Sequence, residues 1–267
     1  MCSDSGDAPL NFSNAVQLLS KRKFKMHPLM VSLKFDLKLF LVLTIAFVFT
    51  TIIGTISHEF GHFVVAKYSS YSASMSYGYT NWEDKSNNDF IDSSYKKYSK
   101  EIELGIDFPE KKKLEILQKR YAEDNFWITL GGPLQTMLTG CLGFLILLFQ
   151  YKKIRQADKL SNLNWLFIFL SLFWLRQTAN FFTWLFGYFY TGNFSSHSDE
   201  IIIALDLNLP TWIFTVISAI IGLLVLAFII FKIIPINKRL TFILSGLLGG
   251  AFGYYFWLFW VGPILMP

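Results

Sequence analysis

Residues 56–66 read ISHEFGHFVVA, an H-E-x-x-H pattern inside a long apolar segment. Residues four apart lie on the same face of a helix, so His58 and His62 would point the same way and can share one metal ion. Glu59 follows the first histidine and can reach a water molecule on that ion. This spacing is typical of zinc hydrolases, in which two imidazoles hold the ion and a carboxylate takes a proton from the water.

The sequence that precedes the motif is typical of a membrane helix. Residues 39–56 are apolar except for threonines and Gly54, and two of the four histidines of the chain lie in the motif that follows. Ionisable side chains in such a segment are costly and usually mark a functional site. The alternative is a pair of histidines at the membrane interface, with Glu59 facing water.

The composition predicts an all-α polytopic membrane protein. Of the 267 residues, 53% are hydrophobic and 16% are charged, whereas soluble proteins contain about 25% charged residues. Several windows exceed the roughly 18 apolar residues that indicate a membrane-spanning helix. The net charge of +5 comes from cations that flank apolar segments, so it predicts contact with the lipid bilayer and no nucleic-acid partner. The two cysteines indicate neither a disulfide framework nor a cysteine-based zinc site.

We expect about five membrane-spanning helices in an integral membrane domain over residues 39–267. A basic N-terminal tail and juxtamembrane segment, residues 1–38, precedes this domain. A small polar insertion over residues 68–124 separates the first two spans. The expected spans cover residues 39–67, 126–151, 163–190, 212–234 and 240–266.

The polar insertion is expected to be partly β or mixed in structure. Residues 71–82 are rich in Tyr, Ser and Thr with partial alternation, which favours short strands. Residues 87–99 are expected to form a loop. A helix is predicted over 109–124, because Pro109 suits its first turn and leucines recur on one face.

Three polar side chains lie within the second and third expected spans. Gln135 can hydrogen-bond a substrate backbone or a developing oxyanion, or it can bond a neighbouring helix. Arg176 and Asn180 share one helix face. An arginine at that depth must meet a carboxylate, backbone carbonyls or a water-filled cavity. Arg176 could therefore neutralise a carboxylate near the metal, or it could be a structural clamp.

A third protein ligand must come from outside the first span, because catalytic zinc usually has three protein ligands and one open position. The loop after the third span contains our first choice, Asp199, followed by Glu200 and His197, and Asp206 lies shortly after. Ser198 is a suitable N-cap for a short helix that begins at Asp199. The alternative is a solvated acidic helix start with no role in metal binding.

The basic residues predict one orientation in the membrane. The short basic stretches fall before the first span, between the second and third, and between the fourth and fifth, which places the N-terminus in the cytoplasm. The motif, Gly131-Gly132-Pro133 at the start of the second span, and the loop with Asp199 then lie toward the opposite side. We expect an integral protein of a bacterial cytoplasmic membrane.

The chain resembles the site-2 protease family of intramembrane zinc metalloproteases. The resemblance is carried by residues 58–67, HEFGHFVVAK, by Gly131-Gly132-Pro133 at the start of the next span, and by a later acidic residue. It implies that His58 and His62 are ligands and that Glu59 is the general base. Gln135 stands where the family usually has a substrate-contacting Asn. The family's third ligand is an Asp in a Leu-Asp-Gly context, a pattern that neither Asp199 nor Asp206 has here.

The expected function is that of a membrane-embedded zinc metallopeptidase, which hydrolyses a peptide bond in or near a transmembrane segment of a substrate through a metal-activated water. The expected substrate is a membrane protein or peptide. Histidine and carboxylate ligands suit Zn²⁺, although iron or cobalt would also fit. The side chains expected to bind substrate or support the site are Gln135, Arg176, Asn180 and Glu200.

Two alternatives remain open at this point. The chain could be a catalytically inactive metal-binding scaffold or sensor that keeps the fold. Less favoured is a small transporter, with Arg176 and the acidic loop along its path. A peptidase requires Glu59 for turnover, a scaffold tolerates Glu59→Gln, and a transporter depends on Arg176 instead.

Overall fold

The computed structural model describes residues 33–156, 159–194 and 198–267. Within these ranges, four helices are long and apolar enough to cross a membrane. The helix lengths and compositions therefore agree with the predicted all-α membrane protein. The predicted basic tail lies mostly outside the described residues. The four candidate spans are Leu37–Tyr68, Lys111–Ile154, Trp212–Ile233 and Ile236–Leu265.

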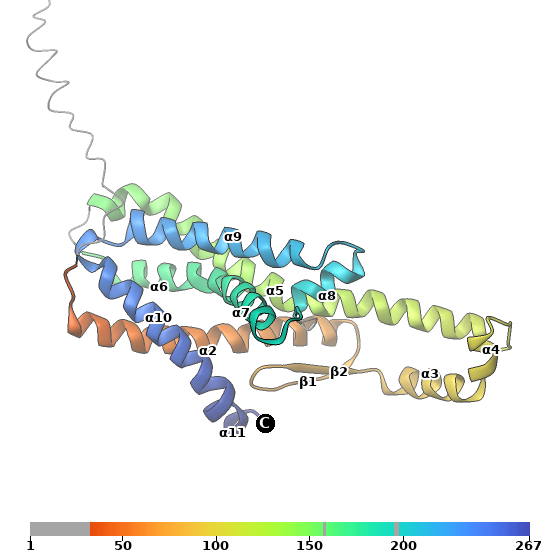
Figure 1. The fold of residues 1–267 in the computed structure, drawn as a ribbon. Helices are drawn as coiled ribbons and strands as arrows, with labels where there is room; N and C mark the ends of the chain where they lie inside the picture. The colour runs from red at the N-terminus through yellow and green to blue at the C-terminus, as the bar shows by residue number, and fades with distance from the viewer. Residues whose placement is uncertain (1–32, 157–158, 195–197) are drawn as a thin grey trace, which may run out of the picture. The chain divides into compact units, whose positions relative to one another are not determined.

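The long helices pack side by side as a bundle (Figure 1). Its elements are α2 (Leu37–Tyr68), α5 (Lys111–Gln156), α6 (Asn162–Ser171), α7 (Leu175–Thr191), α8 (Asp199–Asp206), α9 (Trp212–Phe228) and α10 (Arg239–Phe256). Short helical segments complete the last two spans, namely η2 (Ile229–Ile233), η3 (Ile236–Lys238), η4 (Trp257–Val261) and α11 (Gly262–Leu265).

Glycines bring α2 into close contact with two neighbours. A Cβ built on Gly131 of α5 would lie 2.7 Å from the carbonyl oxygen of Gly61. On the α10 side, a Cβ on Gly253 would lie 2.9 Å from the Cα of Val48. Small residues allow such close backbone approach in membrane helices. Gly54, also on α2, has no atom within 4 Å of a built Cβ.

The predicted third span consists of two shorter helices. The 10-residue α6 and the 17-residue α7 are joined by a 3₁₀ turn, η1 (Leu172–Trp174). Each is shorter than the roughly 20 residues that cross a bilayer alone. In Figure 1, α7 turns away from the direction of α6. Trp174 in the turn fits against Gly140 of α5, where a Cβ would lie 2.5 Å from the indole ring.

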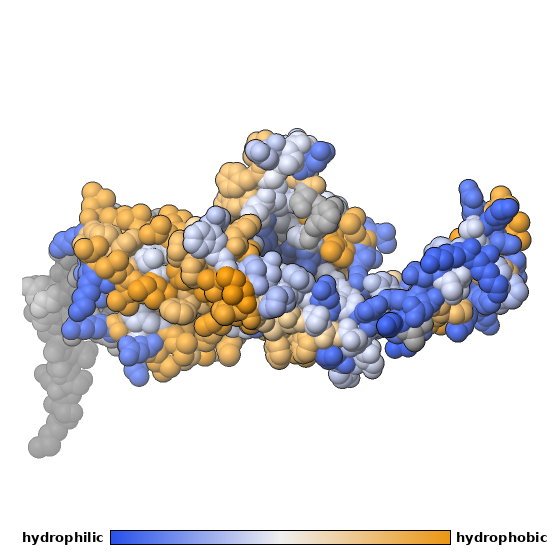
Figure 2. Space-filling model, turned by 90° about the horizontal axis from the view of Figure 1, so that it is seen from below, coloured by the Kyte–Doolittle hydropathy of each residue, from blue (hydrophilic) through white to orange (hydrophobic). Residues whose placement is uncertain are grey.

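The outer surface of the bundle is apolar. Figure 2 shows hydrophobic side chains covering the bundle end of the molecule, whereas the insertion at the other end is mostly hydrophilic. On α2 an exposed stripe runs along one face, formed by Leu41, Ile45, Phe49 and Ile53. Exposed apolar side chains at this spacing fit a helix face that contacts lipid. A helix can lie in lipid because its backbone hydrogen bonds are made within the helix itself.

The polar insertion contains both strands and helices. The strands β1 (Ser72–Met75) and β2 (Thr80–Glu83) form an antiparallel hairpin in which Ser72 pairs with Glu83, so the expected strands are confirmed. The expected loop over 87–99 is wrong, because α3 (Lys85–Lys97) forms there and is followed by α4 (Ser99–Glu103).

Two features stabilise α3 although its sequence contains few apolar residues. The Asp84 side chain accepts a hydrogen bond from Asn87 N at its N-terminus, as an N-cap does. The helix also lies against the start of α5, where the ammonium group of Lys113 is 3.9 Å from the centre of the Phe90 ring. The expected helix over 109–124 is continuous with the second span, and Pro133 lies inside the combined helix α5.

The hairpin is attached to the bundle at both ends. At its base, Tyr71 N donates to Ala66 O at 3.0 Å, and the Tyr71 hydroxyl donates to Asp124 at 3.2 Å. At its tip, Tyr77 N donates to Met266 O at 3.1 Å, and Trp257 Nε1 donates to Tyr77 O at 2.7 Å. The C-terminal segment therefore holds the hairpin beside α2.

Candidate metal centre

The motif lies where α2 crosses α5. His58, Glu59 and His62 are 1%, 5% and 5% exposed. The imidazoles of the two histidines lie directly over Gly132 of α5. A Cβ on Gly132 would overlap Nε2 of His62 and would lie 2.7 Å from Nε2 of His58. A glycine is therefore needed at this position for both rings to fit between the helices.

Each imidazole is oriented by a partner on α5. His62 Nδ1 lies 2.7 Å from the carbonyl oxygen of Ile128, which can only accept, so Nδ1 carries the proton. His58 Nδ1 lies 2.9 Å from Oγ1 of Thr136. The Thr136 hydroxyl donates to Gly132 O at 2.9 Å, so it accepts from His58. In the neutral tautomers that result, both Nε2 atoms have free lone pairs.

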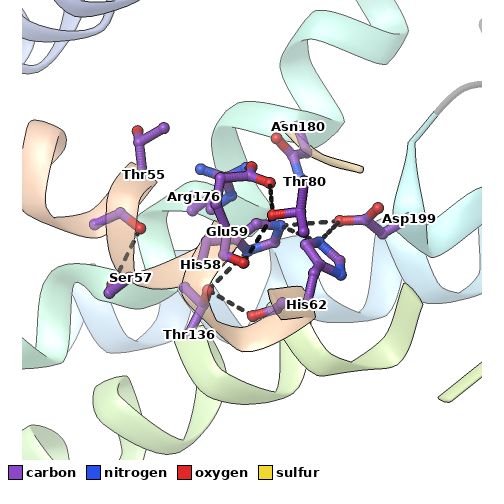
Figure 3. Close-up of polar contacts among 12 residues, drawn as sticks. Thr55, Ser57, His58, Glu59, His62, Thr80, Thr136, Arg176, Asn180 and Asp199 are labelled. Carbon is purple, nitrogen blue, oxygen red and sulfur yellow. Dashed lines mark hydrogen bonds and ion pairs between the residues drawn. The ribbon is translucent and has the colours of Figure 1, made fainter. Parts of the chain in front are cut away.

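Asp199 completes a group of three acceptors. The two Nε2 atoms are 3.2 Å apart, and Asp199 Oδ2 lies 2.9 Å from that of His58 and 3.4 Å from that of His62. All three potential ligand atoms lie within 4.8 Å of one another. Three lone-pair donors that face one another repel unless a cation lies between them. The group His58, His62 and Asp199 can therefore hold a metal ion, as Figure 3 illustrates.

Glu59 lies beside this group and points to a different set of partners. Thr80 of β2 places its hydroxyl 2.9 Å from the Glu59 carbonyl oxygen and 3.2 Å from Oε2 of its carboxylate. Arg176 of α7 places Nη2 at 3.8 Å from the other carboxylate oxygen, Oε1. Figure 3 shows these side chains gathered next to the two histidines. The carboxylate is thus held by the hairpin on one side and by α7 on the other.

The hairpin also covers part of the group. The indole of Trp82 on β2 lies nearly parallel to the His62 ring, with 6.4 Å between ring centres and 24° between planes. Neither Thr80 nor Trp82 stands out in the sequence, because nothing in a short polar hairpin indicates which helix it will meet. Thr136 was visible only as one of the small residues that recur every four positions in α5.

The other acidic candidates are placed differently. Glu200 is 2% exposed and accepts a hydrogen bond from Asn180 Nδ2 at 3.1 Å, so the two side chains join α7 to α8. Burial, and then the negative charge of Asp199, raise the pKa of Glu200. Asp206 is exposed at the end of α8 and outside the group of three acceptors. His197 lies outside the described residues.

Gln135 lies away from Glu59. Its Nε2 donates to Thr139 Oγ1 at 3.1 Å, one turn further along α5. Its Cβ lies 2.9 Å from a Cβ built on Gly61. Successive helix residues are about 100° apart, so Gly61 and Glu59 point about 200° apart around α2. Gln135 therefore approaches α2 on nearly the opposite side from the carboxylate.

Comparisons with known proteins add no assignment: no protein-family model matches the chain, and neither a curated protein nor a solved structure matches it. The chemistry of the site therefore has to be argued from its own geometry.

Proposed function

We propose that the protein is a membrane-embedded zinc metallopeptidase of the site-2 protease type. The observation that carries this proposal is the position of Glu59, a buried carboxylate that adjoins a group of three converging acceptors on the same apolar helix. Two histidines and one carboxylate suit Zn²⁺ and leave a fourth position for water or substrate.

Each residue of the site has a distinct task in this reaction. A bound zinc ion would supply Lewis acidity, which makes water a nucleophile near neutral pH and polarises a carbonyl group. His58, His62 and Asp199 would hold the ion, and the Nδ1 partners keep both imidazoles in the ligating tautomer. Glu59 takes a proton from the attacking water and later returns it to the leaving amine. Thr80 keeps the carboxylate of Glu59 in place.

The substrate we propose is an extended segment of a membrane protein, at or near its transmembrane part. The motif lies within a helix that is apolar enough to cross the bilayer. The hairpin beside it has two strands in the described part of the chain, so a further strand can pair with its free edge. An unwound substrate strand in that position would pass close to Glu59.

We also propose five membrane crossings with the N-terminus in the cytoplasm. Phe228 near the end of α9 lies 5.3 Å from Phe144 and 5.9 Å from Tyr151, between ring centres, near the end of α5. The ends of the two helices therefore lie together. Five crossings result if the intervening chain returns across the bilayer through α6 and α7. By the positive-inside rule, the basic end of the bundle would lie in the cytoplasm. In a bacterial cell, the membrane would be the cytoplasmic membrane.

A metal-binding scaffold is the second candidate. The observation that favours it is the Arg176–Glu59 ion pair, because the cation engages the carboxylate that would have to accept a proton from water. In that case the site would bind the ion without turnover.

The two candidates differ in whether Glu59 is needed for new peptide ends to appear. We would express wild type and Glu59→Gln in the same host and label new N-termini in the isolated membranes. The peptidase proposal predicts N-termini in or near transmembrane segments that appear with wild type and are absent with Glu59→Gln. Identical sets of N-termini in both membranes, with equal protein levels, would support the scaffold instead.

A further inference from the structure

Two arginines among the described residues lie inside the helix bundle, and their surroundings differ sharply. Arg239, 3% exposed, donates from Nη2 to Phe231 O at 2.8 Å and from Nε to Ile234 O at 3.3 Å. These carbonyls belong to the end of the preceding helical segment, where cationic donors are favourable. Arg239 is thus a structural clamp whose hydrogen bonds are made within the protein.

Arg176 is bound far less completely. Its Nη2 is 3.8 Å from Glu59 Oε1, which is beyond the roughly 2.7–2.9 Å of a charged hydrogen bond. Its Nε is buried and has no hydrogen-bond partner. Its side chain is 24% exposed, so part of it is accessible to an incoming group. Because an arginine has five N–H donors, several remain for an acceptor that enters the site.

We propose that Arg176 binds the carbonyl oxygen of the scissile peptide as negative charge develops on it, an inference that rests on the proposed peptidase function. When the water oxygen bonds to the carbonyl carbon, the π electron pair of the C=O bond moves to the carbonyl oxygen. Glu59 takes the proton that the water loses. Arg176 N–H groups then donate to the charged oxygen, and no bond of the guanidinium changes.

The neighbouring polar residues leave this role to Arg176. Gln135 approaches α2 from the other side and already donates to Thr139. Asn180, one turn after Arg176 on α7, already donates to Glu200. Thr80 lies against the Glu59 carboxylate and carbonyl. Among the described side chains in contact with Glu59, Arg176 alone offers a permanent positive charge. Donors aimed at developing charge are often the largest contribution to catalysis.

The test measures binding to the metal site, independently of turnover. Detergent-purified full-length protein is loaded with Co²⁺, whose visible absorption reports on its ligands. It is then titrated with dimethylphosphinate, a tetrahedral anion, and with imidazole, a neutral ligand. The variants are Arg176→Met and, as a matched removal of one positive charge, Lys152→Met at the far end of α5, where the side chain is exposed.

We expect Arg176→Met to weaken phosphinate binding by about tenfold or more, as loss of an oxyanion donor does, and to leave imidazole binding unchanged. Lys152→Met should match wild type for both ligands. If Arg176→Met does not load with cobalt, Arg176→Gln, which keeps a polar side chain, takes its place with the same expectation.

Equal phosphinate affinity in wild type and in the cobalt-loaded Arg176 variant would overturn the role of Arg176 and leave the metal site intact. An equal loss of imidazole binding would also overturn it, because the substitution would then have changed the site as a whole. A wild-type protein that binds no cobalt would overturn the proposed function itself.

Discussion

The start of α5 (residues 111–124) and its crossing with α2 (residues 128–136) make contacts of opposite kinds. At the crossing, Gly131 and Gly132 bring the helix backbone against α2 and place the two imidazoles of the motif over it. At the start, long side chains reach across exposed surface, as where Gln118 Nε2 donates to the Tyr95 hydroxyl at 2.6 Å. The contacts at the crossing leave no room for one added methyl group, whereas those at the start can rearrange. We therefore expect sensitivity to substitution to fall steeply along this one helix.

The largest effect should come from Gly61→Ala, which adds a methyl group at the crossing. Its Cβ would overlap the carbonyl oxygen of Gly131, a backbone atom that cannot rotate away. We expect a loss of about 1–3 kcal/mol in the free energy of unfolding, as overpacking usually costs. Thermal unfolding in detergent measures this loss.

Gly54→Ala is the matched control for that substitution, because it lies two turns earlier in α2 with no atom within 4 Å of its Cβ. It should be neutral or stabilising by up to about 1 kcal/mol, since alanine favours helix. Equal destabilisation by both alanines would mean that the α2–α5 crossing is looser than described.

A smaller effect is expected one turn along α5, at Thr136→Val. Valine keeps the shape of threonine and removes the acceptor of the His58 Nδ1 proton. Loss of such a partner typically weakens metal binding by about 10–100-fold, which competition with a zinc chelator measures. Thr139→Val, one turn further along the same helix, should leave zinc affinity unchanged, and a matching loss there would show that the effect is not specific to the histidine.

Tyr71→Phe tests the base of the hairpin, which contacts α5 at Asp124, between the start of the helix and its crossing with α2. It removes the hydrogen bond to Asp124, so we expect a loss of about 1 kcal/mol in the free energy of unfolding. Burial and the nearby Asp124 raise the pKa of Tyr71 to about 12. The stabilisation should therefore persist up to about pH 10 and disappear as the pH rises toward 12. Tyr71→Phe should lack this alkaline step, and its presence in the variant would assign it to another group.

The smallest effect is expected for Lys97→Met, at the end of α3 and near the start of α5. Lys97 Nζ lies 3.2 Å from Glu110 Oε1, but the side chains are 64% and 33% exposed. Exposed ion pairs contribute little in water. We expect no measurable change in Tm or in zinc affinity. A clear fall in either would mean that α3 is coupled to the site through α5.

The motif could be predicted from the sequence because it depends on local geometry alone. Helical periodicity places His58 and His62 on one face, and the apolar context indicates burial. Asp199 could be chosen only by its chemistry, since it lies 141 residues from His58 and no spacing rule relates them. The structure brings these three residues together, and it leaves Glu200 and Asp206 out of the group.

Other features depend on tertiary contacts that the sequence does not display. Residues 87–99 contain few apolar residues, yet α3 forms because Asp84 caps it and α5 covers one side. The break between α6 and α7 falls inside one continuous apolar run, so no boundary was visible. Gln135 was expected near substrate by analogy with an asparagine, but the direction in which it leaves α5 takes it away from Glu59.

The most direct test of the metal centre is the metal content of detergent-purified protein by plasma mass spectrometry. It would be measured for wild type, His58→Ala, Asp199→Asn and Glu59→Gln. We predict close to one zinc ion per chain in wild type and in Glu59→Gln, and little in the other two variants. A wild-type protein that carries no metal and takes up none when zinc is supplied would contradict a metal site formed by His58, His62 and Asp199. Full zinc content in Asp199→Asn would also contradict it.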